Sequence, residues 1–152
     1  MKTATARKTR SRPASPAPAA PASHFTTLSP SEVQDNRTGL IWSHTLSKEC
    51  VTHADAEKIV AELEAKEKKG WRLATVEELF CLADRSKRNP AIDKEAFPDT
   101  KSDWYWTSTP YAGDPACAWI VNFDGGHSVY GHRSNFLALV RAVRGPAARP
   151  GQ

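Results

Sequence analysis

The segment WIVNFDGGHSVYGHRSNFLALVRAVR, residues 119–144, constrains the fold more than any other part of the sequence. Aromatic and β-branched residues recur at alternate positions on both sides of Gly125 and Gly126, which is the pattern of two strands joined by a tight turn. The alternation extends backwards through WYWTSTPYAGDPACAWIVNF, where a loop from Pro110 to Pro115 separates two runs, and FLALVRAVR reads as a last strand. The C-terminal part therefore predicts several antiparallel strands.

Within this frame, neighbouring positions carry very different side chains. We expect Trp119, Val121 and Phe123 to face the core, because successive residues of a strand point to opposite faces. The intervening residues and those after the turn would form an exposed ligand-binding surface, which consists of Ile120, Asn122, Asp124, His127, Ser128, Tyr130, His132, Asn135 and Phe136. Tyr105 and Tyr111 are further expected contacts, since tyrosine offers a flat ring with a polar end at small entropic cost.

The preceding residues predict a hairpin and two helices. Turn chemistry in DNRTG places a hairpin near residues 31–43. Apolar residues at helical spacing in THADAEKIVAELEAKEKKG predict an amphipathic helix that begins near Thr52 or His53 and stops at Gly70. After a brief extended piece, Thr75 and Glu78 have the spacing of a capping box and predict a second, shorter helix.

A long loop from Arg85 to Asp103 separates the helices from the C-terminal strands, and we expect Ile92 and Phe97 to anchor it in the core. The tryptophans Trp42, Trp71, Trp104, Trp106 and Trp119 are mostly expected in the core as well, because each lies in an apolar or alternating run. This segregation of helices and strands predicts an α+β fold in a single domain.

The domain is expected over residues 26–145, between a disordered tail over 1–25 and a frayed end over 146–152. The tail combines Ala, Pro, Ser and Thr with five basic residues and no acidic one, namely Lys2, Arg7, Lys8, Arg10 and Arg12. The whole chain has 21 basic and 17 acidic residues. Without the five basic residues of the tail, 16 basic and 17 acidic residues remain, so the domain itself carries no basic excess. Nonspecific contact with nucleic acid or another anionic surface is therefore expected of the tail alone, and a role as a spacer or docking arm stays open.

The tail contains no apolar run of the length that a secretory signal needs, and no part of the sequence resembles a membrane span. These observations predict a cytoplasmic protein. Display on a virion or a cell surface by another route stays open.

Several motifs together carry a family resemblance: VQDNRTGLIW, GWRLATVEELFCLADRS, NPAID, AFPD, YWTSTPYAGDPACAWIVNF and LVRAVR. In this order they resemble the Lcl C-terminal domain family, roughly over residues 31–144. The resemblance implies a C-type-lectin-like fold, with two helices flanking a small twisted antiparallel sheet, the first and last strands paired, and a ligand surface on the C-terminal strands. It also implies non-catalytic binding, since family members include adhesion domains that bind polyanionic sugars and many phage or prophage proteins.

The C-terminal part is also similar to the variable proteins of diversity-generating retroelements. In these proteins, adenine-directed mutagenesis changes exposed residues on a fixed lectin-like scaffold. Mutation of an Asn codon at its adenines can reach Ile, Asp, His, Tyr, Ser, Gly and Phe, which fits the side chains of the expected surface. Three hypotheses stay open: a diversified receptor for protein or cell-surface ligands, a lectin of fixed specificity for a glycan or polyanion, and an ordinary solvent-exposed face.

Enzymatic activity is not expected. Formylglycine-generating oxidases share the lectin-like scaffold but depend on paired reactive cysteines, whereas Cys50, Cys81 and Cys117 are widely spaced. Buried structural thiols are expected at Cys81 and Cys117. No Ser, His and Asp set is typical of nucleophilic catalysis either, so an oxidase-like enzyme is the less favoured alternative.

No cofactor is expected. Zinc sites bring cysteines or histidines in close pairs, and the sequence has neither a C-x-x-C nor an H-x-x-x-H motif. Calcium is a weaker candidate at Asn122 and Asp124, whose oxygens lie beside the Gly-Gly turn. These two residues would supply only part of the six to eight oxygen ligands that calcium takes.

Overall fold

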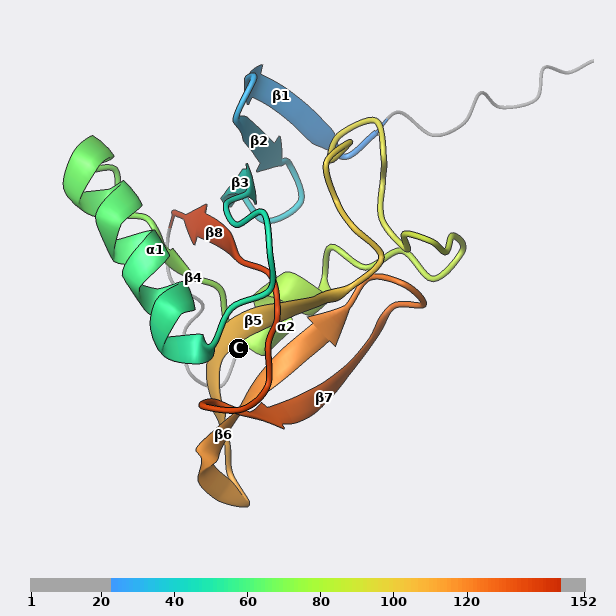
Figure 1. Cartoon of the computed structure of the whole chain (residues 1–152). Coiled ribbons are helices and arrows are strands. Elements are labelled where there is room, and N and C mark those ends of the chain that lie inside the picture. Colours follow the sequence, from blue (N-terminus) through green and yellow to red (C-terminus); the bar gives the residue numbers. More distant parts are fainter. Residues whose placement is uncertain (1–22, 146–152) are drawn as a thin grey trace, which may run out of the picture.

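The structure, a computed structural model, describes residues 23–145. Almost all of the expected tail, with its proposed anionic contacts, and the expected frayed end over 146–152 lie outside the described residues. The elements follow in the order β1 (Phe25–Ser29), β2 (Glu32–Asp35), β3 (Ile41–Thr45), α1 (His53–Glu67), β4 (Arg72–Leu73), α2 (Val76–Phe80), β5 (Trp104–Tyr111), β6 (Asp114–Asn122), β7 (His127–His132) and β8 (Arg141–Arg144) (Figure 1). This mixture of helices and antiparallel strands confirms the predicted α+β class.

The strands form two antiparallel sheets. The larger sheet has the order β1-β2-β3-β8-β4, and the smaller has the order β5-β6-β7. The last strand β8 pairs with β3, where Trp42 lies opposite Val143, and with β4 on its other side. The expected pairing of the first and last strands is wrong, because β1 lies at the edge of the larger sheet and pairs only with β2.

The expected hairpin is confirmed as β2 and β3, and Asp35 stabilises its turn. The Asp35 carboxylate accepts hydrogen bonds from the Arg37 backbone and guanidinium, and the Asp35 backbone accepts one from Gly39. Gly39 has a positive φ of 80°, a conformation that residues with a Cβ rarely adopt. The preceding strand β1 was not predicted from the sequence.

The helix α1 begins as expected and ends at Glu67, three residues before Gly70. The Thr52 side chain accepts a hydrogen bond from the backbone N–H of Asp55, and Lys68 takes the left-handed conformation at the C-terminal cap. After the cap, one oxygen of Glu64 accepts the backbone N–H groups of Lys69, Gly70 and Trp71. These bonds, the one from Trp71 foremost, lower the pKa of Glu64 and direct the chain from the helix into β4.

The short helix α2 has the predicted capping box between Thr75 and Glu78. Glu78 also accepts two hydrogen bonds from the Arg72 guanidinium, each 2.8 Å long, which join α2 to β4. Burial alone would raise the pKa of Glu78, but the bonds from Arg72 and Thr75 outweigh it and lower the pKa. The helix ends at Phe80.

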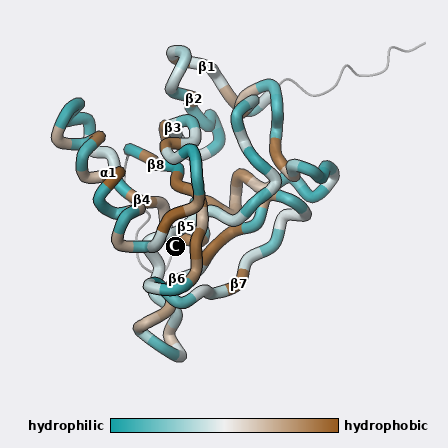
Figure 2. The backbone as a smooth tube through the Cα atoms, viewed as in Figure 1, coloured by the Kyte–Doolittle hydropathy of each residue, from teal (hydrophilic) through white to brown (hydrophobic). Residues whose placement is uncertain are grey.

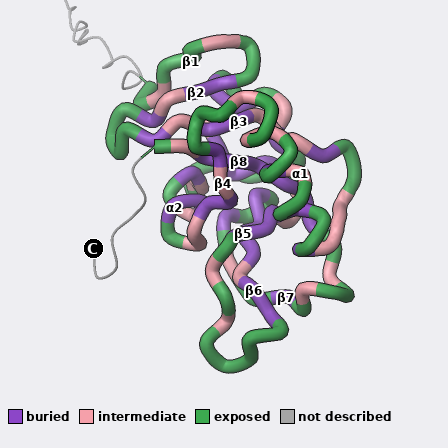
Figure 3. The backbone as a smooth tube through the Cα atoms, turned by 90° about the vertical axis from the view of Figure 1, so that its left-hand side faces the viewer, coloured by how far each residue is buried: buried purple, intermediate pink, exposed green. Residues whose placement is uncertain are grey.

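The smaller sheet lies between two apolar clusters. One face of β5 and β6 places Tyr105, Val121 and Phe123 in a cluster with residues of α2 and of the long loop. The other face places Trp106 and Ile120 in a second cluster with residues of α1, β4 and β8. The hydrophobic stretches follow these strands through the middle of the molecule, whereas exposed residues cover the turn between β5 and β6 (Figures 2 and 3).

The long loop is anchored as predicted, since Ile92 and Phe97 are fully buried. Of the tryptophans, Trp42, Trp71 and Trp106 are buried in the core. Trp104 and Trp119 are only partly buried.

Arg141 of β8 is fully buried at the junction of the two sheets. Its guanidinium lies over the rings of Phe97 and Tyr105, at 4.8 and 5.3 Å from their centroids. The Nη2 atom donates hydrogen bonds to Thr45, Asp99 and Thr100. Burial lowers the pKa of Arg141, while Tyr105 and Asp99 act in the opposite direction.

We predict that Asp99→Ala lowers the free energy of unfolding by about 2 kcal/mol, because it leaves a buried cation without its charge partner. The loss stays below that for a fully buried pair because the Asp99 side chain is 32% exposed. Urea unfolding measures the change. Replacing Arg141 by Met in the same chain should recover part of it, whereas Asp124→Ala, at an exposed carboxylate, should have almost no effect. An equal loss in both single Asp variants would contradict the role of Arg141.

Candidate functional site

Three aromatic side chains gather on one face of the smaller sheet, at the end near the turn between β5 and β6. Tyr111 of β5 and Tyr130 of β7 stack with ring centroids 3.9 Å apart and planes 9° apart. Trp119 of β6 meets Tyr111 and Tyr130 edge-on, at 5.7 and 6.2 Å. We call Tyr111, Trp119 and Tyr130 the aromatic cluster. Tyr130 is 49% exposed, so a large aromatic surface faces solvent.

The backbone fixes the positions of these rings. Trp119 lies directly opposite Tyr130 in the register of β6 and β7, and cross-strand aromatic pairs stabilise sheets. Thr107 of β5 donates a hydrogen bond of 2.8 Å to the carbonyl of Trp119. In the turn, Gly113 lies against the Tyr111 ring so closely that a Cβ there would come within 2.5 Å of a ring carbon. The cluster is therefore positioned before any ligand arrives.

Further polar residues share the face of the aromatic cluster. Alternation along β7 places Ser128 and His132 on the same side of the sheet as Tyr130. His132 is exposed, and its Nδ1 atom lies 3.0 Å from the Ser134 hydroxyl. Asn135 is exposed in the loop that follows β7. Ser128 and His132 therefore place hydrogen-bonding groups on either side of Tyr130 along the strand.

Several residues predicted as exposed contacts are buried, so that part of the prediction is wrong. Ile120 is fully buried in the second apolar cluster, and Asn122 is 8% exposed, because the smaller sheet is covered on both faces. Tyr105 is fully buried, and its hydroxyl lies 2.8 Å from the hydroxyl of Thr45. Phe136 is partly buried and packs edge-on against Trp106 and Trp104.

The remaining predicted residues do not form one surface with the aromatic cluster. Asp124 and His127 are exposed near the turn between β6 and β7. His127 lies opposite Asn122 on the other face of the sheet and packs edge-on against Trp104, with ring centroids 5.3 Å apart. The predicted set is therefore divided between the two faces of the sheet, with Ser128, Tyr130 and His132 on the face of the cluster.

The cysteines differ from expectation in one respect. Cys81 is exposed at the end of α2, so its predicted burial is wrong, whereas Cys117 is buried as expected. Both, like Cys50, are free thiols. Burial raises the pKa of Cys50, and Asp103, whose carboxylate lies 3.6 Å from the sulfur, raises it further.

In residues 23–145, no three His, Cys, Asp or Glu side chains converge in a way that could hold a metal ion. At the predicted calcium position, the Asn122 side-chain oxygen accepts a hydrogen bond from the backbone N–H of Asp124. This oxygen therefore closes the turn between β6 and β7. No helix in the same part of the chain is long and apolar enough to cross a membrane.

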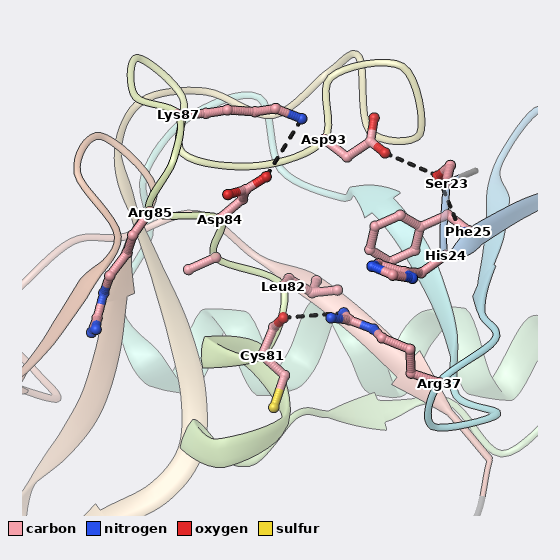
Figure 4. A pocket seen from close by; sticks show the side chains of 11 residues that line it. Ser23, His24, Phe25, Arg37, Cys81, Leu82, Asp84, Arg85, Lys87 and Asp93 are labelled. Carbon is pink, nitrogen blue, oxygen red and sulfur yellow. Dashed lines mark hydrogen bonds and ion pairs between the residues drawn. The ribbon is translucent and has the colours of Figure 1, made fainter. Parts of the chain in front are cut away.

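A polar cavity of about 340 Å³ lies between the start of β1 and the end of α2 (Figure 4). Its charged side chains are paired within the protein: Arg37 donates to the carbonyl of Cys81, Lys87 lies 3.5 Å from Asp84, and Ser23 donates to Asp93. Sequence reasoning missed this cavity, because its lining comes from segments far apart in the chain and contains no motif. Arg85, which also lines the cavity, donates to the carbonyl of Gly126 instead of to a carboxylate.

The family model described as the Lcl C-terminal domain matches residues 31–144. The match covers most of the chain, including every strand of both sheets except β1. No curated protein and no solved structure matches the chain.

We predict that Gly113→Ala displaces the Tyr111 ring and opens its stack on Tyr130, since the added Cβ would overlap the ring. Near-ultraviolet circular dichroism should show a changed aromatic signal, while the free energy of unfolding falls by about 1 kcal/mol or less because the ring can move into solvent. Gly125→Ala is the matched control, since its Cβ would meet nothing closer than 3.7 Å. An unchanged spectrum for Gly113→Ala would mean that the turn does not position Tyr111.

Proposed function

We propose that this chain, which belongs to the Lcl C-terminal domain family, is a non-catalytic ligand-recognition protein. The observation that carries the proposal is the aromatic cluster, in which Tyr130 is 49% exposed and Tyr111 and Trp119 are partly exposed, at the end of a sheet whose middle is buried on both faces. A monomeric domain gains little by leaving such rings in water, and exposed aromatic groups with polar neighbours are typical of binding surfaces. No cofactor is part of this proposal.

The physical basis of binding is preorganisation. A flexible aromatic side chain loses conformational entropy when a ligand orders it, but the rings of Tyr111 and Tyr130 are already stacked on each other. Their edges and hydroxyls, with the imidazole of His132 and the amide of Asn135, offer both apolar contact and hydrogen bonds. This combination suits the faces and hydroxyls of a sugar ring as well as a polar protein surface.

In β7 and the loop after it, the residues that pack against the apolar core are distinct from the residues that could be replaced without changing the core. Ser128, Tyr130, His132 and Asn135 are not in either apolar cluster, so their replacement leaves the core intact. This separation supports the finer proposal that the surface is diversified, as in the variable proteins of diversity-generating retroelements. A lectin of fixed specificity for a glycan or polyanion is the alternative within the same class of function.

The decisive test of diversification is the DNA around the gene. We expect a near-copy of the codons for residues 117–144 that differs from the gene only at adenines, with a reverse transcriptase gene beside it. The differences should fall at Ser128, Tyr130, His132 and Asn135, and should spare the buried residues of β6. If no such copy exists, diversification is wrong and the surface has a fixed specificity.

Binding itself is tested on an array of immobilised glycans that includes heparin, and on intact cells, with the full chain and its Tyr130→Ala variant. We expect this replacement to weaken binding to a captured ligand about tenfold, the effect of losing roughly 1.4 kcal/mol at an aromatic contact. Leu137→Ala is the matched control, because Leu137 is similarly exposed at 52% but lies outside the cluster.

Three outcomes of this test separate the hypotheses. Equal affinity of Tyr130→Ala and the unchanged chain would show that the cluster is not the site. Binding that disappears on removal of calcium, or that falls steeply with salt for heparin alone, would favour the lectin of fixed specificity. A measurable enzymatic turnover by the unchanged chain that Cys117→Ala abolishes would favour the oxidase-like alternative.

A further inference from the structure

The strand β7 is an edge strand with one unpaired side. It is the last strand in the order β5-β6-β7 and pairs with β6 without any shift in register. The backbone N–H of Arg133 donates to the carbonyl of Ala116 over 2.9 Å. In this register, every second residue before Arg133 turns its backbone N–H and C=O groups toward β6. In an antiparallel pair, every second residue turns its N–H and C=O groups away from the partner. In β7 these residues are Ser128, Tyr130 and His132.

The outward groups are open to a further strand over part of this edge. The carbonyl of His132 already accepts hydrogen bonds from the N–H groups of Asn135 and Phe136. Within residues 23–145, no group forms a hydrogen bond with the outward backbone N–H or C=O of Ser128 or Tyr130. Four backbone groups, two donors and two acceptors, therefore lie unused side by side.

The other sheet edges in the described part of the chain are protected against such pairing. The register of β1 breaks between Thr27 and Ser29, and β4 has only two residues. The outer side of β5 is occupied, since Tyr105 forms a bridge with Leu139. Natural proteins protect free edges with charged residues, prolines, bulges or short strands. The sequence of β7, HSVYGH, contains no lysine, arginine, carboxylate or proline, and its ladder is regular.

We propose that β7 pairs with β7 of a second copy of this chain, in antiparallel orientation and with the two-fold axis at Val129. In this register Ser128 of each copy lies opposite Tyr130 of the other, and their outward N–H and C=O groups form four hydrogen bonds. The two Val129 side chains, each 39% exposed in the single chain, face each other and become buried. The result is one continuous sheet of six strands.

Two observations favour a second copy over a strand of another protein. Residues that lie directly opposite each other in a sheet point to the same face. Because side chains alternate between faces, a two-fold axis must therefore pass through a residue such as Val129 or Tyr130 and not between two residues. The axis at Val129 uses all four outward groups of Ser128 and Tyr130, whereas the axis at Tyr130 would need the carbonyl of His132, which is already bonded. The register also brings no like charges together, because HSVYGH contains no lysine, arginine, aspartate or glutamate.

The pairing does not depend on the proposed function, but it would serve it. The two-fold axis stands perpendicular to the sheet, so Tyr130 of both copies stays on the same face. The two aromatic clusters then adjoin and present one larger surface, and a repetitive ligand can contact both copies at once.

The first test measures the mass of the full chain by sedimentation equilibrium over a wide range of concentration. A single edge strand buries less surface than a permanent dimer does, so we expect the mass to rise with concentration from 16.7 kDa toward twice that value. Val129→Lys should keep the chain monomeric, because it places two cations face to face at the axis. Leu137→Lys, the same kind of change at an exposed residue outside β7, should dimerise like the unchanged chain.

A second test determines the register and does not depend on the strength of the dimer. In a chain with the exposed Cys81 replaced by Ser, Val129→Cys should form an intermolecular disulfide on mild oxidation, since the opposed Cβ atoms would be about 4.5 Å apart. Tyr130→Cys in the same background should not, because it would lie opposite Ser128. Circular dichroism of each variant confirms that it is folded.

The proposal is overturned if the unchanged chain stays monomeric at every concentration and Val129→Cys forms no cross-link. It is also overturned if Val129→Lys dimerises like the unchanged chain, because the interface would then lie elsewhere. Since no ligand is present in either test, failure here leaves the proposed recognition by the aromatic cluster intact, and a failure of that recognition leaves the dimer intact.

Discussion

The burial of β5 and β6 on both faces is the constraint on which the rest of the structure depends. Two apolar clusters lie against this small sheet: α2 and the long loop contribute to one, α1 and β4 contribute to the other, and β8 contributes to both. Arg141 joins the two sheets at this junction, with its charge balanced by Asp99 and its plane against two aromatic rings. Because the scaffold is rigid here, the turn between β5 and β6 can hold exposed rings in fixed positions.

The sequence predictions that are confirmed concern features with a local signal, and the one that the burial of the sheet overturns concerns Ile120. The hairpin, both helices with their N-terminal caps, and the buried anchors Ile92 and Phe97 are confirmed, since each has a local signal that tertiary contacts do not override. The predicted exposure of Ile120 is wrong, because alternation along a strand predicts one buried and one solvent-exposed face of the sheet. A small antiparallel sheet commonly has a solvent-exposed face, but here both faces are covered by apolar clusters.

Other features have no local signal. The pairing of β8 with β3 and β4 joins segments far apart in the chain, so no local spacing predicts it. Cys81 was expected in the core because leucine and alanine surround it, but α2 ends one residue earlier and turns the thiol to solvent. For the site, Tyr111 and Tyr130 were both predicted as contacts. That they stack depends on the register across three strands and on the absence of a Cβ at Gly113.

Gly131 is a position in β7 where the packing leaves no room for a side chain. A Cβ there would come within 2.9 Å of the Phe136 ring and 3.3 Å of Ile120, so even alanine would displace the residue that covers this side of the sheet. Its neighbours in β7 have no such restriction. A replacement on either side of this glycine should therefore cost the fold less than a replacement of the glycine itself.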